Sequence, residues 1–332
     1  MKLLGIDLGG TKILGVLANE HGKVLDERLE PTLAHEGLEA VVERLVGVIR
    51  GLTPEGDVDA IGVDVPAPVD TNEGVLYAPP NLPGWSEKGV PLVQVLKKKL
   101  GWGDRVPMLL INDANASALA EYRFGAGRAA VGGRKVLHMI FLTVSTGVGG
   151  GVIVDGKLLL GSNGFAGELG HVVIDADGYR CNCGNAGCLE AMASGTALGR
   201  EAATIVAGQR ETRIAELAGG DPANVTAKMV VEAAQAGDPV ALELMEREAR
   251  LLGAGVGSFV NTFNPQLIAI GGGVSHAGDL LFKPLRAEVK KRVMAPFRDT
   301  YEIVPALLGD KSAALGSVAA AHELCVNVIR NT

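Results

Sequence analysis

Apolar and polar residues follow two different spacings in the first part of the chain. Two short, mostly apolar runs, 3–7 and 13–18, flank a glycine-containing turn, and a third run follows at 24–30. Runs of this length predict a strand, a turn and a second strand, with a third strand after them. Residues 37–52 instead place apolar side chains three and four positions apart, which predicts an amphipathic helix.

The next segment combines the same two patterns with one irregular stretch. Residues 58–65 and 106–111 are strand-like, and residues 114–124 predict a helix that ends at Gly125. Between the two strands, residues 66–91 hold six of the fifteen prolines, which predicts a long loop. Because such a loop in a compact domain is more often functional than not, this stretch is a candidate for ligand contact.

The second part of the chain begins again with strands. A stretch with glycine, alanine and arginine at 125–135 marks an expected domain junction. Beyond it we expect strands with a hairpin turn at Asp155-Gly156, then a mostly helical region, another strand and two more helices. These elements cover, in order, residues 136–144, 151–154, 157–160, 196–262, 267–270, 277–294 and 311–329. The pattern predicts an α/β protein with a small lobe, 1–124, and a large lobe, 125–305, each beginning with strand, turn and strand.

Composition narrows the possible classes of function. Hydrophobic residues make up 47% of the 332 residues, which is ample for a packed core. Acidic residues outnumber basic residues by 38 to 31, and the net charge of −7 disfavours nucleic acid or an anionic membrane as the main partner. The N-terminal residues lack the apolar region of a signal peptide, and no apolar run in the sequence has bilayer length. We therefore expect a soluble, cytoplasmic protein.

Glycine is over-represented, with 46 of 332 residues, roughly twice the usual share. Three clusters each follow a predicted strand: Gly9-Gly10, Gly147 to Gly151, and Gly271 to Gly273. Glycine lets backbone N–H groups approach an anion, and Thr11, Lys12 and Thr146 can add donors or charge. Each cluster alone is also compatible with a simple tight turn. Because the P-loop and Rossmann motifs are absent from the sequence, a bound nucleotide would need a different geometry.

Two aspartates stand where predicted strands end. Asp113 follows the strand at 106–111 and begins a helix, so Asp113 or Asn112 would be an ordinary helix N-cap. The functional alternative is a general base held at a strand end and facing a cleft. Asp7, at the end of the first strand, has the same choice between capping a turn and positioning a cation. The residues alone leave both alternatives open.

Four metal-binding side chains lie close together in the sequence: His171, Cys181, Cys183 and Cys188. Three cysteines and one histidine form an accepted tetrahedral zinc shell without an open position, so zinc here would be structural rather than catalytic. Three free buried thiols are the alternative. A polar, glycine-rich loop in a reducing compartment favours the metal.

Several motifs, in order along nearly the whole chain, resemble the ROK family of bacterial sugar kinases and sugar-responsive repressors. They are Asp7 to Lys12, Asn112 to Ala116, Ser145 to Gly151, Glu168 to His171, Cys181 to Glu190, and Gly271 to Val274. Each motif alone is modest, and the set is highly specific. The resemblance implies a two-lobed actin-like/hexokinase-like ATPase fold (ribonuclease H-like) with a nucleotide in the interlobe cleft. It also implies a C-terminal helix within 306–332 that packs back on the small lobe.

The same resemblance implies roles for individual residues. Asp113 corresponds to the catalytic base, and Asp7 would help to hold Mg²⁺. The expected sugar contacts are Asn81, Asn112, Asp113, Glu168, His171 and Glu190, with His171 also a zinc ligand. The expected nucleotide contacts are Gly9, Gly10, Thr11, Lys12, Thr146 and Gly147 at the phosphates, and Gly272 and Gly273 near the adenosine. Relatives usually carry glycine where this chain has Ala67, so the sugar side of the cleft departs from the family pattern.

The implied activity is ATP-dependent phosphorylation of glucose to glucose 6-phosphate, with Mg²⁺ and a structural Zn²⁺. The expected assembly is a homodimer or homotetramer. Kinases of fructose, N-acetylmannosamine or N-acetylglucosamine are alternatives because their site motifs overlap, and polyphosphate is an alternative donor.

A sugar-responsive repressor belongs to a different class. Such relatives carry a DNA-binding helix-turn-helix ahead of the first glycine turn, which here begins at Gly9 and leaves no room for one.

Overall fold

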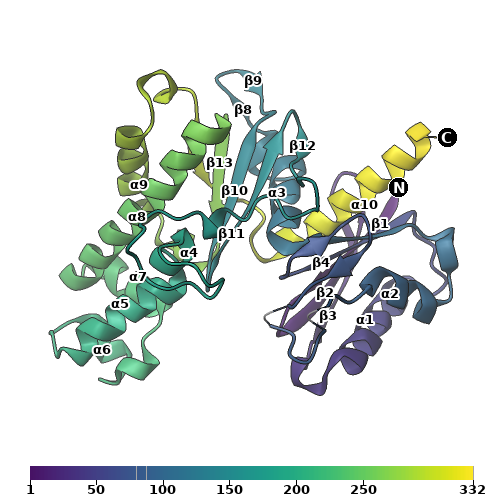
Figure 1. Cartoon of the computed structure of the whole chain (residues 1–332), viewed down its shortest axis with the longest axis horizontal. Coiled ribbons are helices and arrows are strands. Elements are labelled where there is room, and N and C mark those ends of the chain that lie inside the picture. Colours follow the sequence, from purple (N-terminus) through teal and green to yellow (C-terminus); the bar gives the residue numbers. More distant parts are fainter. Residues whose placement is uncertain (80, 87, 332) are drawn as a thin grey trace.

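Two five-stranded sheets form the framework of the protein (Figure 1). A computed structural model describes residues 1–79, 81–86 and 88–331. The first sheet contains β1 (Lys2–Leu8), β2 (Lys12–Asn19), β3 (Val24–Pro31), β4 (Ala60–Val65) and β7 (Met108–Asn112). The second contains β10 (Met139–Val144), β11 (Val148–Val154), β12 (Lys157–Leu158), β13 (Leu267–Gly271) and β14 (Glu302–Pro305).

The two sheets share one topology, with strand orders β3-β2-β1-β4-β7 and β12-β11-β10-β13-β14. In each sheet the first three strands are antiparallel, and the last two run parallel to the first strand. The predicted α/β organisation, in which each lobe begins with strand, turn and strand, is therefore confirmed.

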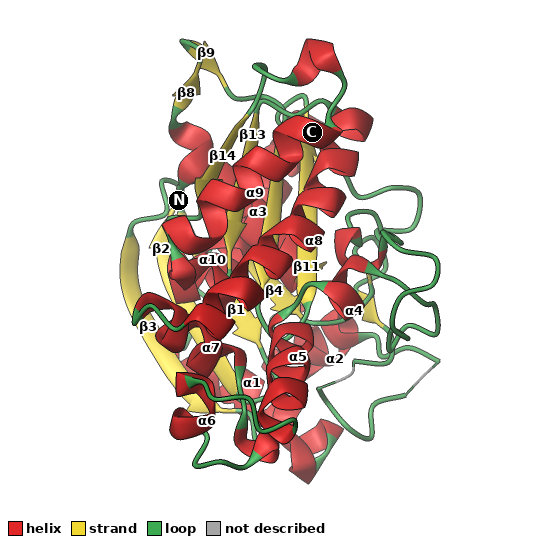
Figure 2. Cartoon of the chain, turned by 90° about the vertical axis from the view of Figure 1, so that its left-hand side faces the viewer, coloured by secondary structure: helices red, strands yellow, loops and turns green. Residues whose placement is uncertain are grey.

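Helices cover both faces of each sheet. One face of the first sheet carries α1 (Leu38–Leu52) and α2 (Leu92–Leu100). One face of the second sheet is covered by a group of helices, seen in front of the strands in Figure 2. The helices of this lobe are α4 (Leu189–Met192), α5 (Gly195–Ala207), α6 (Arg213–Leu217), α7 (Ala227–Gln235), α8 (Pro239–Phe263) and α9 (Asp279–Arg292).

Two further helices, α3 (Asp113–Arg123) and α10 (Ser312–Asn331), lie between the sheets (Figure 1). α3 follows the first sheet in sequence but packs mainly on β10 and β11 of the second. α10 follows the second sheet but packs on β1 and β4 of the first. The two helices also pack against each other, so each lobe is completed by a helix that continues from the other.

The structure differs from the sequence prediction in the second glycine cluster. The strand expected at 151–154 begins at Val148, so Gly149 and Gly150 lie inside β11 with Gly151 rather than in the turn before it. A Cβ on Gly149 would lie 2.9 Å from the Cβ of Ala114, and one on Gly151 would lie 2.5 Å from the Cβ of Ala118. These glycines therefore let α3 approach the sheet closely, and only the residues before β11 form the turn.

Several short or irregular elements were not predicted from residue spacing. They include α2, α4, β14, and the two-residue strands β8 (Ala130–Val131) and β9 (Arg134–Lys135). Two more such strands, β5 (Val69–Asp70) and β6 (Val75–Leu76), lie inside the predicted loop 66–91. Positions 80 and 87 of that loop, and Thr332 at the end of the expected C-terminal segment, lie outside the described residues. None of the described helices has an apolar stretch long enough to cross a membrane.

The contact between α3 and α10 depends on Gly316. A Cβ at this position would lie 1.8 Å from the carbonyl oxygen of Ala116, and a backbone atom cannot swing away as a flexible side chain can. We expect Gly316→Ala to lower the free energy of unfolding by about 1–3 kcal/mol, measured by urea denaturation. Gly47→Ala in α1 is the control, because the space around its Cβ position is open. A Gly316→Ala protein as stable as the wild type would contradict the close contact.

Candidate active site

A cavity of about 620 Å³ opens between the two lobes. Its walls come from the ends of β7 and β10, the start of α3, and the segments that lead from β11 to α5. All six predicted sugar contacts line it: Asn81, Asn112, Asp113, Glu168, His171 and Glu190. Ala67 is buried in the same wall, so the departure from the family pattern lies at the cavity itself.

Asp113 is the first residue of α3 and lines this cavity. Asn112 caps the helix, because its side-chain oxygen accepts the backbone N–H groups of Ala114 at 3.0 Å and Asn115 at 3.1 Å. The Asn112 side-chain nitrogen also donates to Oδ1 of Asp113 at 3.1 Å. The N–H of Ala114 donates to the same Asp113 oxygen at 2.9 Å. Asp113 is therefore held at the cavity wall while Asn112 supplies the cap.

The environment of Asp113 makes its carboxyl a stronger base than an exposed aspartate. Burial raises the pKa of Asp113 to about 7, although the hydrogen bond from Ala114 lowers it. The negative charges of Asp7 and Glu168 act in the same direction as burial. Burial likewise raises the pKa of Glu168. A carboxyl with a pKa near neutrality accepts a hydroxyl proton more readily than one with the ordinary value of about 3.9.

A second carboxyl that was not predicted from the sequence lies beside Asp7. Asp7 on β1 and Asp64 on β4 occupy paired positions of two parallel strands. Asp64 is fully buried, and Ser317 of α10 donates a hydrogen bond to its Oδ2 at 2.8 Å. Burial raises the pKa of both carboxyls. The signal in the sequence is an aspartate inside the otherwise apolar run 60–65.

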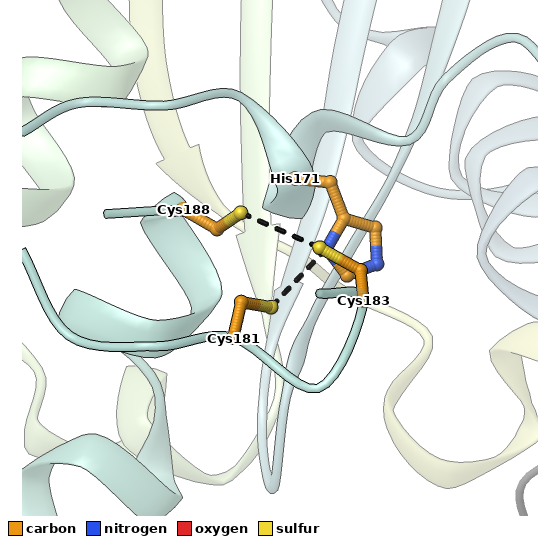
Figure 3. Close-up of side chains that lie close together, drawn as sticks. All are labelled: His171, Cys181, Cys183 and Cys188. Atoms are coloured by element: carbon orange, nitrogen blue, oxygen red, sulfur yellow. Dashed lines mark hydrogen bonds between the residues drawn. The ribbon is translucent and has the colours of Figure 1, made fainter. Parts of the chain in front are cut away.

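The four predicted metal ligands meet at one point (Figure 3). Their ligand atoms all lie within 4.8 Å of one another. Sγ of Cys183 lies 3.6 Å from Sγ of Cys188, and Sγ of Cys181 lies 3.6 Å from Nδ1 of His171. Tetrahedral zinc with bonds of about 2.3 Å needs sulfurs roughly 3.8 Å apart. A disulfide needs about 2.05 Å. The donor set and its spacing therefore fit Zn²⁺ and not a disulfide.

This cluster of candidate metal ligands adjoins two carboxylates of the cavity. Nε2 of His171 lies 3.9 Å from Oε2 of Glu168, while Nδ1 faces Cys181. Oε2 of Glu190 accepts the backbone N–H of Val148 at 3.0 Å, and Oε1 lies 3.9 Å from Sγ of Cys181. A histidine that binds zinc through one ring nitrogen commonly donates to a carboxylate through the other. The state of the cluster therefore bears on the orientation of Glu168 and Glu190.

A second cavity, of about 930 Å³, adjoins the first. Four residues line both cavities: Ser145, Thr146, Thr196 and Arg200. The rest of the second lining includes Ala203, Val225, Thr226, Lys228, Val231, Glu232, Gln235, Gly273 and His276. Most of these residues lie on or beside α5 and α7, where no motif marks them, so they were not predicted from the sequence. A ligand in the second cavity can reach the first at the shared wall.

Part of the predicted nucleotide set reaches these cavities. Thr146 lines both, Gly147 lines the first and Gly273 lines the second. Gly272 adopts a φ of 86°, and a Cβ there would lie 2.4 Å from the carbonyl oxygen of Val144. Gly272 therefore shapes the turn that presents Gly273.

The first glycine turn lies outside both cavities. Gly9, Gly10, Thr11 and Lys12 are absent from the lining that the described residues form. Gly10 nevertheless packs against Asn81, since a Cβ on Gly10 would lie 2.7 Å from that of Asn81. The turn thus adjoins a residue of the first cavity's wall without being part of that wall.

Comparison with known proteins finds close relatives over the whole chain. A sequence profile described as the ROK family matches residues 3–324. A glucokinase of Thermotoga maritima is 38% identical over 323 residues, 97% of this chain and 98% of that protein. A xylose repressor of Caldicellulosiruptor bescii is 33% identical over 323 residues, 96% of this chain and 77% of the repressor.

The fold has equally close counterparts among solved structures. The crystal structure of a ROK family glucokinase from Streptomyces griseus, in complex with glucose and AMPPNP, superposes with a TM-score of 0.80. Its sequence identity is 32%, and the match covers 97% of this chain and 100% of that one. The expected two-lobed hexokinase-like fold is therefore confirmed.

Proposed function

The chain belongs to the ROK family, and we propose that it transfers a phosphoryl group from ATP to glucose, forming glucose 6-phosphate. The half-buried Asp113 carboxyl, at the wall of a cavity that adjoins a second, larger one, is the main support. The relative solved with glucose and AMPPNP, and the Thermotoga maritima glucokinase, support a hexose and ATP as the substrates.

Asp113 acts as the general base in this reaction. As the 6-hydroxyl oxygen of glucose bonds to the γ-phosphorus, its proton passes to the Asp113 carboxylate, and the bond from phosphorus to the β–γ bridging oxygen breaks. The Asn112 hydrogen bond to Oδ1 orients the carboxylate for this transfer. Phosphoryl transfer depends mostly on positioning, so the fixed base contributes chiefly by aligning the hydroxyl group.

The remaining cavity residues bind the sugar. Glu168 and Glu190 suit a neutral sugar, because each carboxylate can accept hydrogen bonds from more than one hydroxyl group. Asn81 and Asn112 offer both donors and acceptors, and His171 lies between the sugar site and the metal cluster.

ATP fills the second cavity with its adenosine, near Gly272 and Gly273. Its phosphates reach the shared wall, where they meet Thr146 and Gly147. The first glycine turn, residues 9–12, comes to the phosphates when the two lobes close. Closure also excludes water, which would otherwise accept the phosphoryl group.

Two metals fit the residues present. Asp7, beside Asp64, offers the carboxylate oxygen that Mg²⁺ prefers, and Mg²⁺ bound with ATP neutralises charge on the phosphoryl oxygens. The cluster of His171 and the three cysteines would hold Zn²⁺. Bound there, zinc would hold the loop between Glu168 and Glu190 and so fix the orientation of these two carboxylates.

ADP release across a panel of sugars tests the proposed reaction. We expect turnover with glucose, ATP and Mg²⁺. Fructose, N-acetylmannosamine and N-acetylglucosamine are the alternative acceptors, and polyphosphate is the alternative donor. If the protein binds a sugar but turns over none of them, the proposed kinase activity is contradicted. That result would favour a sugar-responsive regulator, the class to which the xylose repressor belongs. Assembly as a homodimer or homotetramer and a cytoplasmic location stay predictions.

The raised pKa of Asp113 predicts how the rate depends on pH. The carboxyl accepts a proton only when ionised, so kcat/KM for glucose should rise with pH and level off above about 7. On the acidic side the rate should fall about tenfold per pH unit. The measurement is kcat/KM between pH 5 and 9 at saturating MgATP, with circular dichroism at each pH to confirm folding. A flat profile down to pH 5 in a folded protein would contradict the assignment.

A further inference from the structure

Glu121, near the end of α3, is a buried carboxylate that the proposed chemistry does not use. Its side chain is fully buried. Oε1 accepts the backbone N–H groups of Leu307 at 2.8 Å and Leu308 at 2.7 Å, and Oε2 accepts that of Ala126 at 2.9 Å. A buried carboxylate is costly unless hydrogen bonds satisfy it, and these three donors do so.

The three donors belong to two different connections of the chain. Ala126 lies just after α3, in the segment that leads to β10. Leu307 and Leu308 lie between β14 and α10. Gly125 allows the first connection to wrap around the carboxylate, because a Cβ there would lie 2.1 Å from Oε2 of Glu121. One side chain therefore joins the exit of α3 to the entrance of α10.

This joint lies at the pair of helices, α3 and α10, that packs between the two lobes. Because α3 packs mainly on the second sheet and α10 on the first, rotation of one lobe against the other turns these helices against each other. A second tie lies near the first, since Nη2 of Arg123 is 2.8 Å from Nδ1 of His322 on α10. The opposite end of α3 begins with Asp113.

We propose that Glu121 is a positioning residue that clamps the two connections together and provides the pivot about which the lobes close on their substrates. Its effect on the reaction rests on the proposed function. With this end of α3 fixed to the entrance of α10, closure brings the first glycine turn, residues 9–12, toward Asp113 along one path. Without the clamp, the lobes still meet but present Asp113 at variable angles.

Glu121→Gln tests the clamp at constant side-chain size. Glutamine has one acceptor oxygen, so it loses either the Ala126 bond or the Leu307 and Leu308 bonds. We expect kcat/KM for glucose to fall about 10–100-fold at a temperature where the variant is folded. X-ray scattering should also show less contraction than in the wild type when glucose and AMPPNP are added.

Glu248→Gln is the matched control. Glu248 is also fully buried, lies on α8 away from both connections, and its two carboxylate oxygens lack a hydrogen-bond partner among the described residues. This variant should keep the wild-type kcat/KM and contraction. The Glu121→Gln variant could instead lose only thermal stability, with kcat/KM and the contraction unchanged. That result would overturn the proposal, because the hydrogen bonds of Glu121 would then serve only the stability of the fold.

Amide hydrogen exchange provides a measurement that depends neither on turnover nor on the variant folding. In the wild type, the amides of Ala126, Leu307 and Leu308 should be protected, and equally so with and without glucose and AMPPNP, because a pivot does not open as the lobes close. Loss of their protection when these two compounds bind would overturn the proposal. If the wild type phosphorylates none of the sugars, the proposed function fails. Amide hydrogen exchange and X-ray scattering would still show whether Glu121 clamps the two connections together.

Discussion

Replacement of Asp113 by alanine should lower kcat for glucose phosphorylation by about 10²–10⁴-fold, the usual contribution of a general base. Asp113 is the carboxyl at the first cavity whose pKa burial raises to about 7, and it begins the helix that the proposed pivot orients. The alanine variant lacks both the proton acceptor and the group that aligns the hydroxyl. The measurement is initial-rate ADP release at saturating glucose and MgATP.

Two controls separate loss of the base from loss of the site. Glucose binding, measured by calorimetry, should persist in Asp113→Ala because Glu168 and Glu190 remain. Asp104→Ala should leave kcat unchanged, since Asp104 is an exposed surface residue paired with Lys97. If Asp113→Ala turns over glucose as fast as the wild type, Asp113 is not the general base.

Loss of the metal cluster should have the second largest effect. Cys183→Ala removes one of four ligands, so we expect the purified variant to lack the zinc that the wild type carries, as measured by plasma mass spectrometry. The loop between Glu168 and Glu190 then loses its anchor, and KM for glucose should rise about 10–100-fold, as is typical when groups around a metal site are misplaced. Stability should fall by about 4 kcal/mol if free zinc exceeds its dissociation constant a thousandfold.

The fourth cysteine is the control for this experiment. Cys325 lies on α10, away from the cluster, and its thiol lies 3.6 Å from the backbone oxygen of Asp59. Cys325→Ala should therefore keep the zinc and the KM for glucose. Wild-type protein purified without zinc, and a Cys183→Ala protein with an unchanged KM, would together contradict the structural metal.

Residue spacing predicted most of the elements because their periodicity is local. The helix expected at 37–52 is α1 (Leu38–Leu52), and the three opening strands are β1 to β3. The second glycine cluster was predicted wrongly for a non-local reason. Gly149 and Gly150 are typical of a turn in isolation, but they lie in a strand on which α3, more than twenty residues earlier in the chain, packs closely.

The candidate site residues that lie in short sequence motifs were predicted. Those that only tertiary packing brings together were missed. The predicted metal ligands and the predicted sugar contacts lie in recognisable motifs, and the structure brings each set together. Asp64 was missed, since its partner Ser317 is 253 positions away. The second cavity was missed because its lining on α5 and α7 follows no motif. The first glycine turn was expected at the phosphates, and it lies outside the linings that the described residues form.

Identification of the phosphorylated product tests the central claim most directly. Wild-type protein is incubated with glucose, Mg²⁺ and ATP labelled in the γ-phosphoryl group, and the products are separated. We predict that the label appears in glucose 6-phosphate, in equal amount to the ADP formed, and that Asp113→Ala leaves it on ATP. The contrary result is that, with glucose and with each alternative sugar, the label stays on ATP or reaches only inorganic phosphate. This result would contradict the proposed phosphoryl transfer to a sugar.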